Sequence, residues 1–133
     1  MIEQQFADLQ LRVAELSPAS NVTMTALPGG SALIKVTGIA IEGWNRPAAD
    51  ILFVAPVGYP GAVPDCFWVE PTGLRVGEAE TPQASNDSNG IPGDIMPNRS
   101  TTWFSWHMQG WNPNRDTLYS FFLVILDRLR PAR

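Results

Sequence analysis

The order of predicted elements places this chain in the α+β class. Three observations predict this class: an apolar stripe at helical spacing near the N-terminus, several short apolar segments separated by turns, and a second helical stripe near the C-terminus. The connections between the predicted strands are short, whereas a parallel pair needs a crossover of about a dozen residues or more. We therefore expect a four-stranded antiparallel meander with the first helix on one face.

The first helix is expected over residues 2–16. Apolar side chains recur there at helical spacing: Phe6, Leu9, Val13 and Leu16. Glu3 lies near the start, where an acidic side chain suits the helix dipole, and Ser17-Pro18 ends the helix. A stripe of this kind favours an amphipathic helix packed on the sheet over a surface for a partner protein.

The strands are expected in the first half of the chain. Residues 21–26 and 31–41 are predicted to form a hairpin, with Leu27-Pro-Gly-Gly30 as its turn. The nearly continuous apolar run of residues 50–55 predicts a central strand that is covered on both faces. A fourth strand is expected at residues 66–69, after a rigid proline-rich turn.

The second half of the chain is predicted to be a long loop followed by a helix. Residues 72–100 hold few apolar side chains, and loops of this length are usually functional or mobile. The final helix is expected to have Asn112 as its N-cap and Pro113 as its first residue, and Pro131 should stop it. Its apolar face is marked by Leu118, Phe121, Phe122, Ile125 and Leu129.

The composition predicts a single globular domain over residues 1–133 and excludes several functions. A net charge of −4 gives no basic field for a nucleic acid. No apolar run reaches signal length or the ~20 residues of a membrane span, so we expect a soluble, cytoplasmic protein. One cysteine and one histidine provide neither a disulfide nor a usual metal cluster, and we expect no metal or cofactor.

Two stretches of the chain have the pattern of a known family. Residues 58–71 contain Tyr-Pro, a short spacer, Pro-Asp, one residue and Phe-Trp. This motif resembles the flap between the third and fourth strands of the ubiquitin-conjugating enzymes, in the form found in a divergent bacterial branch. Trp111-Asn-Pro113 resembles the Trp-x-Pro that follows the active site of the family. The resemblance implies the same order of elements, and we expect Tyr59, Pro60 and Trp111 to belong to a binding surface.

The cysteine of the standard family is missing at its expected place. The resemblance puts it about eight residues before the tryptophan, where this chain has Trp103. Met96-Pro97-Asn98 also lacks the histidine of the family's His-Pro-Asn turn. Cys66 lies within the flap motif, where we expect the family to carry Met, so a packing role is its simplest interpretation. It is the less favoured candidate for a catalytic carrier.

Ser105 and His107 are the favoured catalytic pair. The other hydroxyls near the expected site are Ser100, Thr101 and Thr102. Residues two apart project to the same side of an extended segment, and a histidine can take the proton of a serine hydroxyl. The alternative is a loop serine beside a histidine packed among tryptophans. Asp116 could orient His107, although an acid at a helix start is also explained by the dipole.

The sequence leaves three possible functions, each from a different class of protein. The resemblance implies a transferase of a bacterial ubiquitin-like modification pathway, such as one for antiphage defence, that accepts a ubiquitin-like protein from an activating enzyme and passes it to a target. Without the usual cysteine, the ubiquitin-like protein would be carried as an oxyester on Ser105 or a nearby hydroxyl, or as an unusual thioester on Cys66. The second function is a degenerate binding module for the same partners. The third is a small hydrolase, against which the absence of Gly-x-Ser-x-Gly counts.

Overall fold

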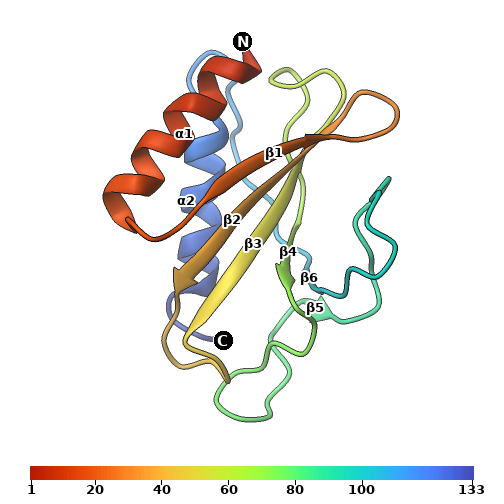
Figure 1. Cartoon of the computed structure of the whole chain (residues 1–133). Helices are drawn as coiled ribbons and strands as arrows, with labels where there is room; N and C mark the ends of the chain where they lie inside the picture. The colour runs from red at the N-terminus through yellow and green to blue at the C-terminus, as the bar shows by residue number, and fades with distance from the viewer.

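The computed structural model describes residues 1–133, with two helices and one antiparallel sheet (Figure 1). The helices are α1 (Ile2–Leu16) and α2 (Leu118–Leu129). The strands are β1 (Val22–Ala26), β2 (Ala32–Ala40), β3 (Ala48–Ala55), β4 (Phe67–Glu70), β5 (Ser85–Asn86) and β6 (Thr102–Phe104). The sheet order is β1-β2-β3-β4-β6-β5, and every pair of neighbours is antiparallel. The α+β class and the antiparallel pairing are confirmed.

The prediction of four strands was wrong, because the sheet has six. β6 pairs with β4, and the two-residue strand β5 pairs with β6. Strands of two and three residues are too short to show an alternating pattern in the sequence. Their pairing depends on a partner strand that lies far away along the chain, which local composition does not reveal.

The segment from 72 to 100 is more ordered than its composition predicted. Leu74 is fully buried and Ile91 nearly so. The hydroxyl of Thr102 accepts the backbone N–H groups of Gly73 and Leu74 at 3.0 and 3.1 Å, and it donates to the Asp87 carboxylate at 2.6 Å. This segment therefore packs on the sheet through a few apolar residues and a network of polar contacts.

The start of α2 was also predicted wrongly. The helix begins at Leu118, and its N-cap is Thr117, which forms a capping box with Ser120. Asn112 instead begins a separate turn, in which its carbonyl accepts the backbone N–H groups of Arg115 and Asp116. The Asn-Pro pair thus directs a local turn, and the Thr-x-x-Ser pattern a few residues later starts the helix.

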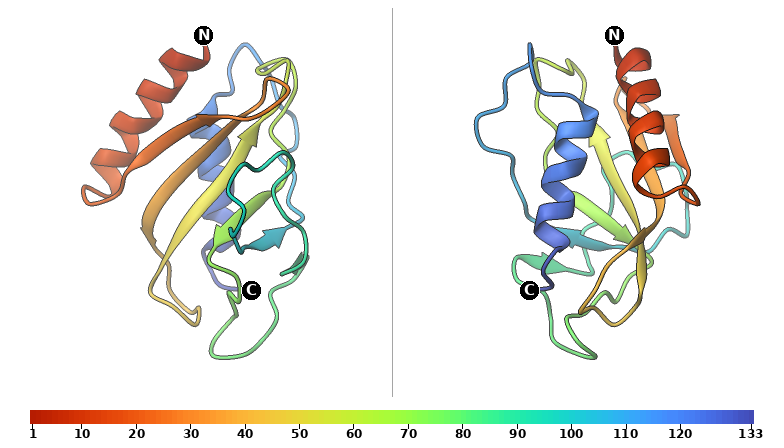
Figure 2. Two further views of the ribbon diagram at one scale, coloured as in Figure 1. Left: turned by 45° about the vertical axis from the view of Figure 1, so that its right-hand side comes forward. Right: turned by 90° about the vertical axis from the view of Figure 1, so that its left-hand side faces the viewer.

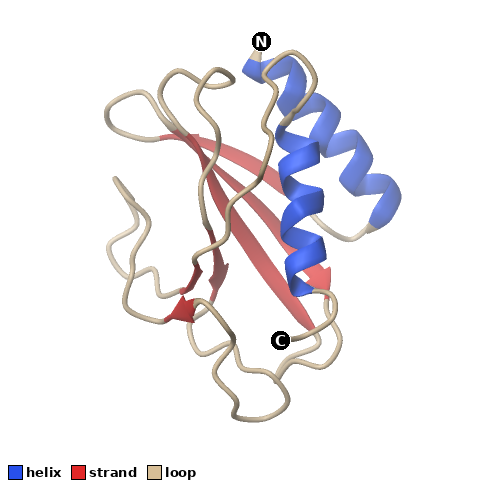
Figure 3. Cartoon of the chain, turned by 180° about the vertical axis from the view of Figure 1, so that it is seen from behind, coloured by secondary structure: helices blue, strands red, loops and turns tan.

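Apolar residues are buried on both faces of the sheet, but unequally. Both helices lie on one face (Figure 3), over a cluster of 21 buried residues that includes Phe53, Phe67 and Phe121. The opposite face carries a smaller cluster: Leu27, Leu33, Leu52, Trp68 and Ile91. The segment between β5 and β6 runs along this second face (Figure 2).

Strand β3 lies between the two clusters. Its neighbours in the sheet are β2 and β4, and three consecutive residues, Ile51, Leu52 and Phe53, are fully buried. Leu52 belongs to the smaller cluster, and its two neighbours belong to the larger one. The prediction of a central strand covered on both faces is confirmed. Neither α1 nor α2 combines the length and the apolar character needed to cross a membrane.

Candidate functional site

Pairing between β4 and β6 brings two distant segments together. Phe67 lies opposite Phe104, and Trp68 lies opposite Trp103. Beyond the ends of both strands, the backbone N–H of Cys66 donates to the carbonyl of Trp106 at 3.0 Å. Residues 65–66 are therefore held beside residues 105–107.

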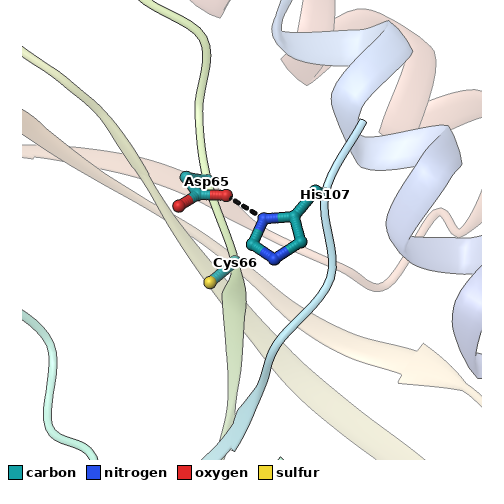
Figure 4. Close-up of side chains that lie close together, drawn as sticks. All are labelled: Asp65, Cys66 and His107. Carbon is teal, nitrogen blue, oxygen red and sulfur yellow. Dashed lines mark hydrogen bonds and ion pairs between the residues drawn. The ribbon is translucent and has the colours of Figure 1, made fainter. Parts of the chain in front are cut away.

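Three polar side chains at this junction, those of Asp65, His107 and Ser105, are linked by successive contacts. The Nδ1 atom of His107 contacts a carboxylate oxygen of Asp65 (Figure 4), and the Nε2 atom of His107 lies 3.4 Å from the hydroxyl oxygen of Ser105. When the proton is on Nδ1, that N–H donates to Asp65 and leaves Nε2 free to accept the Ser105 hydroxyl. This is the order of groups that activates a serine in acyl-transfer enzymes. The Ser105–His107 distance is long, as is common before a substrate binds.

Asp65 was overlooked in the sequence, where Asp116 was considered for the role of orienting His107. In the structure, Asp116 is buried and accepts the backbone N–H of Asn112 at 2.8 Å, so it stabilises the turn before α2. Asp65 directly precedes Cys66 in the flap motif, far from His107 along the chain. No local pattern links the two residues, since their contact depends on the pairing of β4 with β6.

Cys66 lies next to this line of side chains. It is half-buried, and its backbone has a φ of 64°, in the left-handed region that non-glycine residues rarely adopt. Burial raises the pKa of the Cys66 thiol, and the Asp65 carboxylate raises it further. The Cys66 sulfur, a ring nitrogen of His107 and a carboxylate oxygen of Asp65 all lie within 4.8 Å of one another. The thiol is close to the histidine but is disfavoured as a thiolate.

A cleft of about 580 Å³ opens beside Asp65 and Cys66. One wall is formed by the end of β3 and the turn after it, and the other by residues 88–90 and Pro92. Its apolar lining includes Val54, Val57, Val63, Trp68 and Trp103. Asp65 and Cys66 thus border a partly apolar cleft, whereas Ser105 and His107 are not among its lining residues.

The other hydroxyls considered in the sequence are placed differently. Thr101 and Thr102 are buried, and the Thr102 hydroxyl is already bonded to Asp87. Ser100 is exposed. Ser105 is the hydroxyl that lies within hydrogen-bonding distance of His107. Trp103, at the place expected for a cysteine, lines the cleft.

The predicted binding residues Tyr59, Pro60 and Trp111 contact one another. The indole N–H of Trp111 donates to the carbonyl of Pro60 at 2.8 Å, and the rings of Tyr59 and Trp111 are tilted, with centroids 5.9 Å apart. The Tyr59 hydroxyl bonds to Gln5 of α1, and burial raises the pKa of Tyr59. These contacts fasten the flap to α1 and to the segment that follows His107.

An N-terminal helix, an antiparallel sheet with a flap after its third strand, and a C-terminal helix are consistent with an E2-like fold. The chain belongs to prokaryotic E2 family E, whose profile matches residues 21–132. Comparisons with curated proteins and with solved structures gave no match. Family membership supports an E2-like role, and it covers β1 to α2 and hence every residue of the candidate site.

Proposed function

We propose that this protein is an E2-like transferase that carries a ubiquitin-like protein as an oxyester on Ser105. It acts in the cytoplasm, in a bacterial ubiquitin-like modification pathway such as one used against phage. Its partners are an activating enzyme, from which it receives the ubiquitin-like protein, and a target. The observation that supports this reaction best is the line from Asp65 through His107 to Ser105.

The first step is acyl transfer to the serine. The Ser105 oxygen attacks the carbonyl carbon of the thioester that joins the ubiquitin-like protein to the activating enzyme, and Nε2 of His107 takes the hydroxyl proton. The carbon–sulfur bond then breaks, and the departing sulfur receives that proton from His107. Asp65 holds the ring by its contact with Nδ1 and stabilises the imidazolium that forms in between.

The second step passes the acyl group to an amine. A neutral amine of the target attacks the ester carbonyl and gives up a proton to Nε2 of His107. His107 then passes this proton to the Ser105 oxygen as the carbon–oxygen bond breaks, so that the target keeps the new amide bond. His107 and Asp65 are both more than half exposed, which leaves room for an incoming partner. The cleft beside Asp65 offers an apolar surface for the approaching chain.

Cys66 is the second candidate for the carrier, because its sulfur lies within 4.8 Å of ligand atoms of both His107 and Asp65. Its product would be a thioester. The raised pKa of the thiol counts against it, since the thiolate is the nucleophilic form. No hydrogen bond joins Cys66 to His107, whereas Ser105 has one.

The two carriers are distinguished by incubating the protein with the activating enzyme, ATP and the ubiquitin-like protein. We expect a covalent adduct that survives thiol reductants and is cleaved by mild base. Ser105→Ala should abolish the adduct, and His107→Ala should slow its formation by about 10²–10⁴-fold, the usual contribution of a positioned general base. Asp65→Asn should slow it as well, since the amide cannot stabilise the imidazolium.

Ser100→Ala is the matched control, because Ser100 is an exposed hydroxyl near the site in sequence. It should form the adduct at the normal rate. An adduct that reductant cleaves, and that does not form in Cys66→Ala, would show that Cys66 is the carrier. Absence of any adduct would favour a binding module for the activating enzyme or the ubiquitin-like protein.

A further inference from the structure

The only cysteine and the only histidine of the chain lie together in the fold. They come from different segments, one before β4 and one after β6. With Asp65 they place a sulfur, a nitrogen and an oxygen atom within 4.8 Å of one another (Figure 4). The acyl transfer proposed above uses His107 and Asp65 but leaves the Cys66 thiol without a role.

We propose that Asp65, Cys66 and His107 form a binding site for a thiophilic divalent cation such as Zn²⁺. A thiolate, an imidazole nitrogen and a carboxylate oxygen are the donors that zinc uses in proteins, and three protein ligands leave a fourth position for water. The sequence led us to expect no metal site, because one cysteine and one histidine are too few ligands; the proposal departs from that expectation because the fold brings Asp65 to them as a third donor.

The geometry requires only small movements of side chains. Zinc bond lengths of about 2.0–2.3 Å put tetrahedral ligand atoms roughly 3.3–3.8 Å apart. The side chains of Asp65 and His107 are 63% and 54% exposed, so they are free to rotate toward the cation. The backbone bond between Cys66 and Trp106 keeps the two segments in place while they do so.

Charge and protons also balance. The Cys66 thiol releases its proton to solvent as the metal–sulfur bond forms, and the resulting thiolate and the Asp65 carboxylate together neutralise the two charges of the cation. The cation takes the place of the direct contact between Asp65 and His107. If Ser105 is the carrier, as proposed above, metal binding removes its base and inhibits adduct formation.

The test is a Co²⁺ titration of the protein, prepared without a polyhistidine tag and monitored by its absorption spectrum. We expect saturation at one equivalent, a sulfur-to-cobalt charge-transfer band in the near ultraviolet, and displacement of the cobalt by Zn²⁺. Cys66→Ala should remove the band. His107→Ala and Asp65→Asn should each weaken binding by at least about tenfold. Ser105→Ala is the matched control and should bind Co²⁺ as the unchanged protein does.

Absence of a saturable band, or a band that persists in Cys66→Ala, would overturn the metal site. Far-UV circular dichroism shows whether each variant is folded. If His107→Ala does not fold, the cobalt affinity of Asp65→Asn still tests the site. The titration needs neither activating enzyme nor ATP. A negative titration would therefore contradict the metal site without bearing on the Ser105 adduct, and a missing adduct would not bear on the metal site.

Discussion

The two faces of the sheet differ in how they are covered. On the helix face, α1 and α2 bury a cluster of 21 residues, with Phe67 and Phe104 stacked at a centroid distance of 4.7 Å. On the opposite face, a cluster of five buried residues includes Ile91 of the segment between β5 and β6, and the indole N–H of Trp68 donates to the carbonyl of Asn89 in the same segment at 2.9 Å. Cys66 and Trp103 pack on this second cluster. The difference indicates that the helix face supplies most of the stability, while the second face leaves Cys66 and Trp103 at the lining of a cleft.

The largest effect expected from this comparison is on the helix face. Phe121 is 1% exposed and its ring packs on Phe53, so Phe121→Ala should lower the free energy of unfolding by about 3–5 kcal/mol. Urea denaturation at neutral pH measures the change. Leu123→Ala on the same helix is the control, because Leu123 is 39% exposed and should change stability much less. Equal losses of stability in the two variants would contradict the large contribution assigned to the buried side of α2.

An intermediate effect is expected where polar contacts hold the covering segment. Asp87 bonds to Arg75, Thr102 and the backbone of Gly73. These contacts, the one to Arg75 foremost, hold the pKa of Asp87 well below its usual range. Asp87→Asn should cost about 1–3 kcal/mol at neutral pH, toward the low end because the side chain is partly exposed.

The same variant makes a prediction about pH. A carboxylate whose pKa is lowered in the folded state stabilises the protein above its unfolded pKa of about 3.9, and it loses this contribution as the pH falls below that value. Urea denaturation at about pH 7 and about pH 3 should therefore show a smaller difference between the unchanged protein and Asp87→Asn at the acidic pH. A difference that does not change with pH would mean that the charge of Asp87 contributes nothing.

The smallest effect concerns the backbone of Cys66. A non-glycine residue in the left-handed region is strained by roughly 1–2 kcal/mol, and glycine is not, although glycine costs more entropy on folding. Cys66→Gly should therefore be more stable than Cys66→Ala, by about 0.5–1 kcal/mol. Thermal unfolding of the two variants measures it. Ala26→Gly in β1 is the control and should be destabilised. A glycine at position 66 that also destabilises relative to alanine would show that the strain is absent.

Features that depend on neighbours in sequence could be predicted. The periodic stripe of α1 and the turn between β1 and β2 follow from local patterns. The contact between Ser105 and His107 does so too, because the two residues lie two apart in an extended segment. The apolar run in β3 was enough to predict a strand covered on both faces.

Features that depend on distant pairing could not be predicted. β5 and β6 are too short to show a pattern, and the contact of Asp65 with His107 exists because β6 pairs with β4. The start of α2 was misplaced for a different reason. The sequence contains two helix-start signals there. Asn112-Pro113 forms a local turn, and the capping box at Thr117 begins the helix.

The hydrogen bond from the backbone N–H of Cys66 to the carbonyl of Trp106 lies just beyond the paired ends of β4 and β6. If this end of the ladder opened locally, Asp65 and His107 would separate and the partly buried thiol would become more exposed at the same time. One local opening would then link the orientation of the base to the exposure of the sulfur. Any reagent that captures the thiol in the opened state depletes the assembled state by mass action, even though it never touches Ser105.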